Sequence, residues 1–196
     1  MILPEEIYGL EDLRPGDVGF GPIHGRVGAG IKAALTIVDG NAPYQHTFMV
    51  VKAAERVGPD NRLVGPTAIE AMPHGALRVD IGNRWTRKYC YVRPDYETQE
   101  QAWGVAQSAL ALEGTPYSIL DYGAIGLHEA HVPVPHLKAY IESSKHLICS
   151  QLVDKVLTDN DWHPFDDDRW PGFVTPSALF NEFDRRKPRL IFAYPN

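Results

Sequence analysis

The sequence predicts an α+β domain with a mainly antiparallel sheet. Segments typical of β-strands cluster in the first half of the chain and recur at its end, and segments with helical spacing lie between them. The chain has 196 residues, of which 44% are hydrophobic, so it is long enough to bury the core of one globular domain. We therefore expect a single domain over residues 1–196, with a long connecting segment at about 118–147.

The expected strands combine β-branched and aromatic residues with turn-forming neighbours. Pro15-Gly16-Asp17 marks a turn that leads into the first strand, and Pro73-His74-Gly75 joins two later strands. The predicted strands cover residues 18–20, 45–51, 67–72, 75–81, 89–92 and 190–193.

The expected helices have apolar residues every three or four positions. They cover residues 25–38, residues 97–113 and a stretch that begins at Cys149. Gly114 follows the second of these helices as a stop signal. Thr175 followed by Pro176 indicates the start of a fourth helix, because threonine is a good N-cap and proline is favoured at the first helical position.

The composition argues against nucleic acid as a partner and against a membrane span. The net charge is −6, and the nearest approach to a basic cluster, residues 84–88, has only three cations. The first residues have no basic start, and no apolar run in the sequence is long enough to cross a bilayer. These features predict a cytoplasmic protein, and they agree equally with a protein that is released by lysis or encoded by a phage.

Cys149 is the strongest candidate for a functional residue. It follows the apolar run 146–148 and opens a segment with helical spacing, so its thiol is expected in the first turn of a helix. The unpaired N–H groups and the dipole of a helix N-terminus favour an anion, and the thiolate is the reactive form of cysteine. Cys149 is therefore a candidate nucleophile if a histidine reaches its sulfur. The other cysteine, Cys90, is expected to be a buried strand residue.

His46 is the best-placed base among the eight histidines, because it begins a rigid apolar strand. The alternative is a histidine at a strand edge that is satisfied by water. Glu70 lies in the apolar segment 68–72, where a carboxylate needs a partner or a cleft. Glu70 is thus a candidate to orient the imidazole of His46, with a water-exposed carboxylate at a sheet edge as the alternative. His74 is the competing candidate for this third role.

Two short motifs resemble those of the NlpC-type papain-like cysteine peptidases. Gly114-Thr115-Pro116-Tyr117 and Cys149-Ser150-Gln151-Leu152-Val153 match the Gly-x-Pro-Tyr and Cys-Ser-x-Leu-Val patterns of that family. In ordinary members the histidine strand follows the cysteine, whereas here the segments with His46 and Glu70 precede it. This order resembles the circularly permuted branch, which includes the YiiX-type proteins and the lecithin–retinol acyltransferase-like enzymes. Residues 174–179 are similar to the segment that follows the cysteine helix in the YiiX-type group.

The resemblance implies a papain-like, circularly permuted fold in which a mainly antiparallel sheet packs against the helix with the nucleophile. It implies Cys149 as the nucleophile, His46 as the general base and then acid, and Glu70 as the orienting residue. It also implies that Tyr117 lies beside the thiol and donates to the oxyanion, together with the backbone N–H of Cys149.

These roles lead us to expect a thiol-dependent hydrolase, a peptidase or amidase that cleaves an amide bond through an acyl-enzyme on Cys149. By family analogy alone, the substrate is a peptide or isopeptide such as those of the bacterial cell wall. One alternative is an acyltransferase or thioesterase that acts on a lipid or acyl substrate with the same residues. Another alternative is a non-catalytic binding module that keeps the fold but does not convert a substrate. The sequence departs from the family in two places: the segment 118–147 is longer than usual, and Gln151 replaces a glycine. Both departures bear on which substrate is bound more than on the chemistry.

No metal or cofactor is expected. His128, His131 and His136 have a spacing that a zinc site would need, but Pro133 and Pro135 break any helix there and no second ligand pair is present. These histidines are expected to line or cover the cleft.

Overall fold

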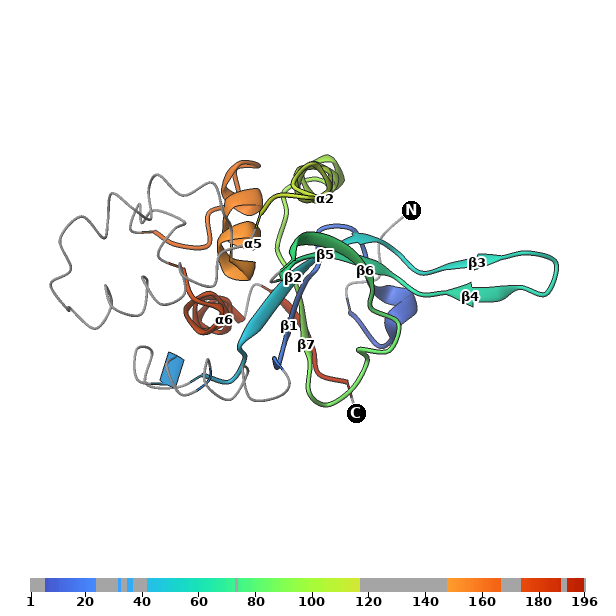
Figure 1. Cartoon of the computed structure of the whole chain (residues 1–196), viewed down its shortest axis with the longest axis horizontal. Helices are drawn as coiled ribbons and strands as arrows, with labels where there is room; N and C mark the ends of the chain where they lie inside the picture. The colour runs from blue at the N-terminus through green and yellow to red at the C-terminus, as the bar shows by residue number, and fades with distance from the viewer. Residues whose placement is uncertain are drawn as a thin grey trace, which may run out of the picture.

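The computed structural model describes residues 6–23, 32, 35–36, 42–72, 74–116, 148–166, 174–187 and 190–195. The elements within these ranges are a short 3-10 helix η1, eight strands and three α-helices (Figure 1). In chain order they are η1 (Leu10–Asp12), β1 (Val18–Gly21), β2 (His46–Lys52), β3 (Glu55–Val57), β4 (Arg62–Val64), β5 (Thr67–Met72), β6 (Gly75–Asp80), β7 (Cys90–Arg93), α2 (Gln99–Ala111), α5 (Cys149–Thr158), α6 (Pro176–Arg185) and β8 (Ile191–Ala193).

Six strands form one sheet in the order β6-β5-β2-β1-β7-β8, and every neighbouring pair is antiparallel. The predicted α+β class with a mainly antiparallel sheet is therefore confirmed. β2 is the third strand of six, so it is hydrogen-bonded on both sides, to β1 and to β5. Its residues are buried except for the last, which explains why this segment is a nearly continuous apolar run in the sequence.

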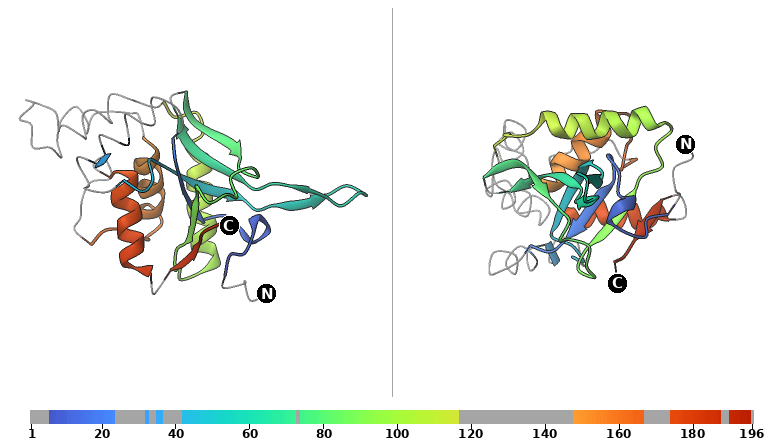
Figure 2. Two further views of the ribbon diagram at one scale, coloured as in Figure 1. Left: turned by 90° about the horizontal axis from the view of Figure 1, so that it is seen from below. Right: turned by 90° about the vertical axis from the view of Figure 1, so that its right-hand side faces the viewer.

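The two faces of the sheet have separate cores. Met49 and Val51 face the first core, which includes the apolar residues of α2, α5 and α6. Phe48 and Val50 alternate with them and face the second core, to which the N-terminal segment contributes Ile7. The helices α2, α5 and α6 thus lie on one side of the sheet and η1 lies on the other (Figure 2).

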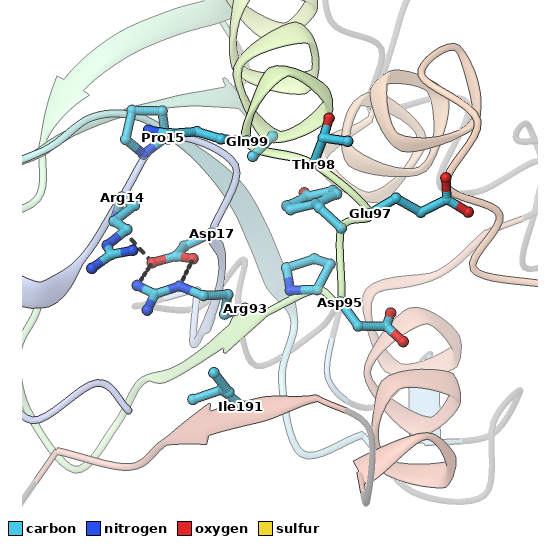
Figure 3. Close-up of a pocket in the computed structure, with 12 residues that line it drawn as sticks. Arg14, Pro15, Asp17, Arg93, Asp95, Glu97, Thr98, Gln99 and Ile191 are labelled. Atoms are coloured by element: carbon cyan, nitrogen blue, oxygen red, sulfur yellow. Dashed lines mark hydrogen bonds and ion pairs between the residues drawn. The ribbon is translucent and has the colours of Figure 1, made fainter. Parts of the chain in front are cut away.

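The turn before β1 is fixed by an ionic network (Figure 3). The buried carboxylate of Asp17 accepts hydrogen bonds from Nε and Nη2 of Arg93, at 2.8 and 2.7 Å, and from the backbone N–H of Arg14 at 2.9 Å. Gly16 has a φ of +96°, and a Cβ there would lie 3.0 Å from the ring of Tyr96. The turn lines a cavity of about 400 Å³ that neither His46 nor Cys149 lines. This segment therefore has a structural role in the entry to β1.

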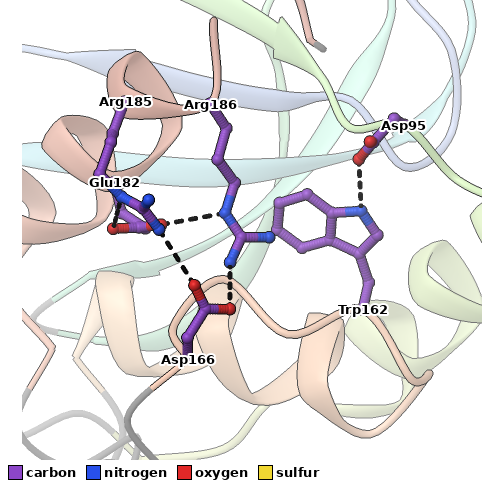
Figure 4. Close-up of polar contacts among 6 residues, drawn as sticks. All are labelled: Asp95, Trp162, Asp166, Glu182, Arg185 and Arg186. Carbon is purple, nitrogen blue, oxygen red and sulfur yellow. Dashed lines mark hydrogen bonds and ion pairs between the residues drawn. The ribbon is translucent and has the colours of Figure 1, made fainter.

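The chain that follows α5 is anchored to α6 (Figure 4). Trp162 is buried, its indole N–H donates to Asp95 at 3.1 Å, and the guanidinium of Arg186 lies 5.5 Å from its ring. Asp166 is exposed, but it accepts hydrogen bonds from both Arg185 and Arg186. The segment 159–166, which follows α5, is thus tied to the helix layer through Trp162 and Asp166.

The short helix η1 was not predicted, and neither was the two-stranded sheet of β3 and β4, which extends away from the main sheet (Figure 1). Each strand has only three residues, of which the first two are exposed, so neither has the alternation of a half-buried strand. The turn signal was present, because Gly58 and Asn61 adopt positive φ values and the N–H of Asn61 bonds to the carbonyl of Gly58.

Two further predictions concern the first helix and a membrane span. The helix predicted at residues 25–38 lies almost entirely outside the described residues. In the ranges that are described, no helix has the length and apolar character needed to cross a bilayer.

Candidate active site

Cys149 is the first residue of α5, and the residue is 1% exposed. The preceding residue, Ile148, has extended backbone geometry and serves as the N-cap. Its side chain has no acceptor, so the end of the helix is stabilised from within: Oε1 of Gln151 accepts the backbone N–H of Ile148 at 2.8 Å. Gln151 stands where the family that the sequence resembles has a glycine. Its side chain therefore helps to fix the turn that presents the thiol.

His46 is the first residue of β2, and it is 5% exposed. Its Nε2 lies 2.8 Å from Oε2 of Glu70, on the neighbouring strand β5. His46 is two residues from Phe48 on β2, and Glu70 is two residues from Ala68 on β5. Residues two apart on a strand share a face, so both side chains are on the face of the second core. The sequence predicted each residue separately, and the sheet register brings their side chains together.

The imidazole of His46 also interacts with Cys149. Burial by itself disfavours the imidazolium, yet the pKa of His46 is raised from 6.5 to about 9. The Coulombic interaction and the hydrogen bond with Cys149, followed by those with Glu70, outweigh the burial. Because Nε2 is bonded to Glu70, Nδ1 is the ring nitrogen left for the sulfur. The contact forms at one end of the sheet, where the first residue of β2 meets the first residue of α5.

Glu70 has a second partner that the sequence interpretation missed. Arg84 donates from Nη1 to Oε2 at 2.6 Å and from Nη2 to Oε1 at 3.0 Å. Burial alone would raise the pKa of Glu70, but the hydrogen bonds from His46 and Arg84 lower it to about 2. Glu70 is 3% exposed and remains ionised because two donors compensate for its burial.

The sequence held one signal for Arg84. A carboxylate within a buried strand requires a cation or several donors, and Arg84 lies in the connection between β6 and β7, close to Glu70 along the chain. Several aromatic contacts hold this connection. The guanidinium of Arg84 lies 5.1 Å from the ring of Phe48, the hydroxyl of Tyr91 donates to the Arg84 carbonyl at 3.1 Å, and Trp85 stacks on Tyr91.

Two glycines of β1 give these rings their space. Gly19 is paired with Phe48 and Gly21 is paired with His46. A Cβ on Gly19 would lie 2.1 Å from the Phe48 ring, and a Cβ on Gly21 would lie 2.3 Å from the ring of Tyr89. The Phe48 ring thus lies over Gly19, which has no side chain, and the centroid of the ring is 6.2 Å from that of the His46 imidazole.

The remaining predicted site residues are not part of this cluster. His74 is exposed in the turn between β5 and β6, and the interactions of Glu70 do not include it. Tyr117 lies outside the described residues, as do His128, His131 and His136. Cys90 is fully buried in β7, as predicted, and burial raises the pKa of its thiol to about 12.

The candidate site is therefore a connected series of four side chains: Cys149, His46, Glu70 and Arg84. Comparison with models of known protein families found no match to this chain, and comparison with curated protein sequences found none either.

Proposed function

We propose that the protein is a thiol-dependent hydrolase that cleaves an amide bond through an acyl-enzyme on Cys149. The supporting observation is the unbroken series of interactions from Cys149 through His46 to the ionised carboxylate of Glu70. A cysteine nucleophile needs a base in contact with it and a group that orients the base. The pKa of His46, raised to about 9, means that the imidazolium is stable beside the sulfur, which favours the thiolate–imidazolium pair.

The chemistry follows from these three groups. The sulfur of Cys149 attacks the carbonyl carbon, and the carbonyl oxygen takes the electron pair. The imidazolium of His46 gives its proton to the leaving amine, so the C–N bond breaks and a thioester remains. A water molecule then gives a proton to the neutral imidazole and attacks the thioester, which releases the carboxylic acid and restores the pair.

Glu70 acts by positioning. It accepts the Nε2 proton of His46 at 2.8 Å, which fixes the tautomer and the ring plane and stabilises the imidazolium. We assign the oxyanion to the backbone N–H groups in the first turn of α5, because a helix N-terminus supplies N–H groups and a positive dipole. From the sequence resemblance, Tyr117 is proposed as a second donor.

The proposed fold is the papain-like, circularly permuted NlpC-type arrangement. It is supported by the chain order, in which the strand with His46 precedes the helix with Cys149, and by the packing of α5 against β2 and β5. On this proposal the substrate is a peptide or isopeptide linkage such as those of the bacterial cell wall.

Alkylation of the two cysteines across pH tests the catalytic pair. We expect iodoacetamide to label Cys149 well below pH ~8.5, the usual pKa of a free thiol. Cys90 serves as an internal control, since its pKa of about 12 keeps it unreactive. His46→Ala should move the Cys149 profile to higher pH, whereas His74→Ala, at an exposed residue, should not. Equal, slow labelling of both thiols would favour a binding module that keeps the fold without turnover.

Assays on peptidoglycan fragments and on acyl esters test the reaction itself. Cys149→Ala should lower hydrolysis by at least ~1000-fold, because the nucleophile is lost. An unchanged rate would refute the enzyme. Added hydroxylamine competes with water for the thioester, so the ratio of hydroxamate to free acid measures acceptor choice. Strong preference for an added acyl acceptor over water would favour an acyltransferase that uses the same residues.

A further inference from the structure

A second cavity lies beside Arg84. It has a volume of about 750 Å³ and is formed by the end of β6 and the connection from β6 to β7. Arg84, Arg87 and Lys88 contribute three cations to its walls, and Asp80 contributes the one carboxylate. The net charge of this group of residues is positive even when Glu70, which is bonded to Arg84, is counted with Asp80, although the net charge of the chain is −6. The cavity is therefore a local exception to the acidic character of the chain.

The donors of this cavity are largely unused. The side chains of Arg87 and Lys88 make no hydrogen bond or ion pair with any residue that the structure describes. Arg84 uses two of its five N–H donors on Glu70, and the side chain is 20% exposed. Asp80 forms no ion pair with these three cations; its Oδ1 accepts the backbone N–H of Gly82 at 2.7 Å, and its single charge offsets only one of the three.

We propose that this cavity binds a phosphate group, held by Arg87, Lys88 and the remaining N–H donors of Arg84. A planar guanidinium and an ammonium together match the several oxygens of a phosphate, and a dianion compensates for more than one cation. A monocarboxylate has a single charge and two oxygens, so it satisfies fewer of these donors. Arg84 would then contact the phosphate on one side and Glu70 on the other.

Calorimetric titration of the full chain at constant ionic strength tests the site. Inorganic phosphate should bind saturably with one site per chain. Arg87→Gln should weaken this binding by about fivefold or more, since a charge-assisted hydrogen bond is lost. Arg62→Gln is the matched control, because Arg62 is also exposed and has no side-chain partner among the described residues, and its affinity for phosphate should stay unchanged.

The absence of saturable phosphate binding, an equal loss in both variants, or equal affinity for acetate would overturn the site. Phenyl phosphate distinguishes the source of the group. Tighter binding of phenyl phosphate than of inorganic phosphate assigns the site to a phosphate ester on a larger ligand, and the reverse assigns it to the free ion. The same titration on Cys149→Ala should give the same affinity, so this test does not depend on catalysis.

Occupation of the site should also affect the thiol, a consequence that rests on the proposed function. Along the series Cys149–His46–Glu70–Arg84, a negative charge at Arg84 is nearer to the imidazolium than to the thiolate. It therefore stabilises the imidazolium and, more weakly, opposes formation of the thiolate. Below the midpoint of the Cys149 profile the imidazole is already protonated, so saturating phosphate should lower the alkylation rate of Cys149 there, and Arg87→Gln should remove this decrease. An unchanged rate with intact binding would overturn the coupling, whereas an unreactive Cys149 would refute the proposed function and leave the binding site.

Discussion

Arg84 and His46 share one oxygen of Glu70. Oε2 accepts a hydrogen bond from Arg84 Nη1 at 2.6 Å and lies 2.8 Å from His46 Nε2, while Oε1 is bonded to Arg84 Nη2. The carboxylate cannot rotate without breaking the bonds to Arg84, so its orientation toward His46 is fixed by a residue in the connection between β6 and β7. Arg84 is thus a positioning residue, and its contribution can be separated from that of Glu70.

Arg84→Gln should destabilise the protein by about 2–3 kcal/mol, because it leaves a buried carboxylate without its cation. Urea denaturation measures the change. Arg78→Gln removes a similar ion pair, with Glu113, in which both side chains are about half exposed, and should cost less than about 1 kcal/mol. Equal effects of the two substitutions would contradict the buried role of Arg84.

Glu70→Gln should lower the pKa of His46 below its raised value of about 9, because the carboxylate charge and a charge-assisted hydrogen bond to the ring are lost. A less stable imidazolium makes the ion pair less favourable, so the alkylation profile of Cys149 should move to higher pH. The imidazole can be followed directly by NMR titration. A pKa that is unchanged in Glu70→Gln would show that Glu70 does not orient this ring.

Acid should weaken the wild-type protein through Glu70. Its folded-state pKa, about 2, is below its usual 4.5, so its contribution to stability is complete above pH 4.5 and is lost as the pH falls through 2. The expected loss is on the order of 3 kcal/mol. Urea midpoints measured between pH 5 and pH 2 should therefore fall more steeply in the wild type than in Glu70→Gln. Parallel curves would indicate that the carboxylate is not ionised in the folded protein.

Gly19→Ala should destabilise the fold by about 1–3 kcal/mol, since the new Cβ would lie 2.1 Å from the Phe48 ring and force it to move. The thermal unfolding midpoint reports this change. Gly9→Ala is a suitable control, because no atom lies within 4 Å of a Cβ at that position. If Phe48 moves toward His46, alkylation of Cys149 should change in Gly19→Ala as well.

The sequence was informative wherever a residue's own neighbours determine its structure. The buried strand β2, the helix start at Cys149 and the N-cap Thr175 each follow from local patterns, and Thr175 accepts the N–H of Ala178 as its type predicts. The roles of Cys149, His46 and Glu70 as a catalytic group stay predictions. What the structure adds is that the three side chains form one series of contacts.

Arg84 could not be predicted in the same way. Whether it reaches Glu70 depends on the pairing of β5 with β6 and on the path of the following connection, neither of which is encoded in a local pattern. The β3–β4 hairpin was missed for the opposite reason. Its strands are short and exposed, so the hydrophobic periodicity that predicts strands is absent there.

The pairing of the sheet has a consequence for how the chain folds. Phe20 pairs with Cys90 and Tyr91 pairs with Ala193, so neighbouring strands come from distant parts of the chain. Domains with such non-local contacts form in milliseconds to seconds, more slowly than helical bundles, because long loops must close first. The thiol and the imidazole come from different elements of this slow assembly. After dilution from urea, the return of Cys149 reactivity should therefore lag behind the far-ultraviolet circular dichroism signal.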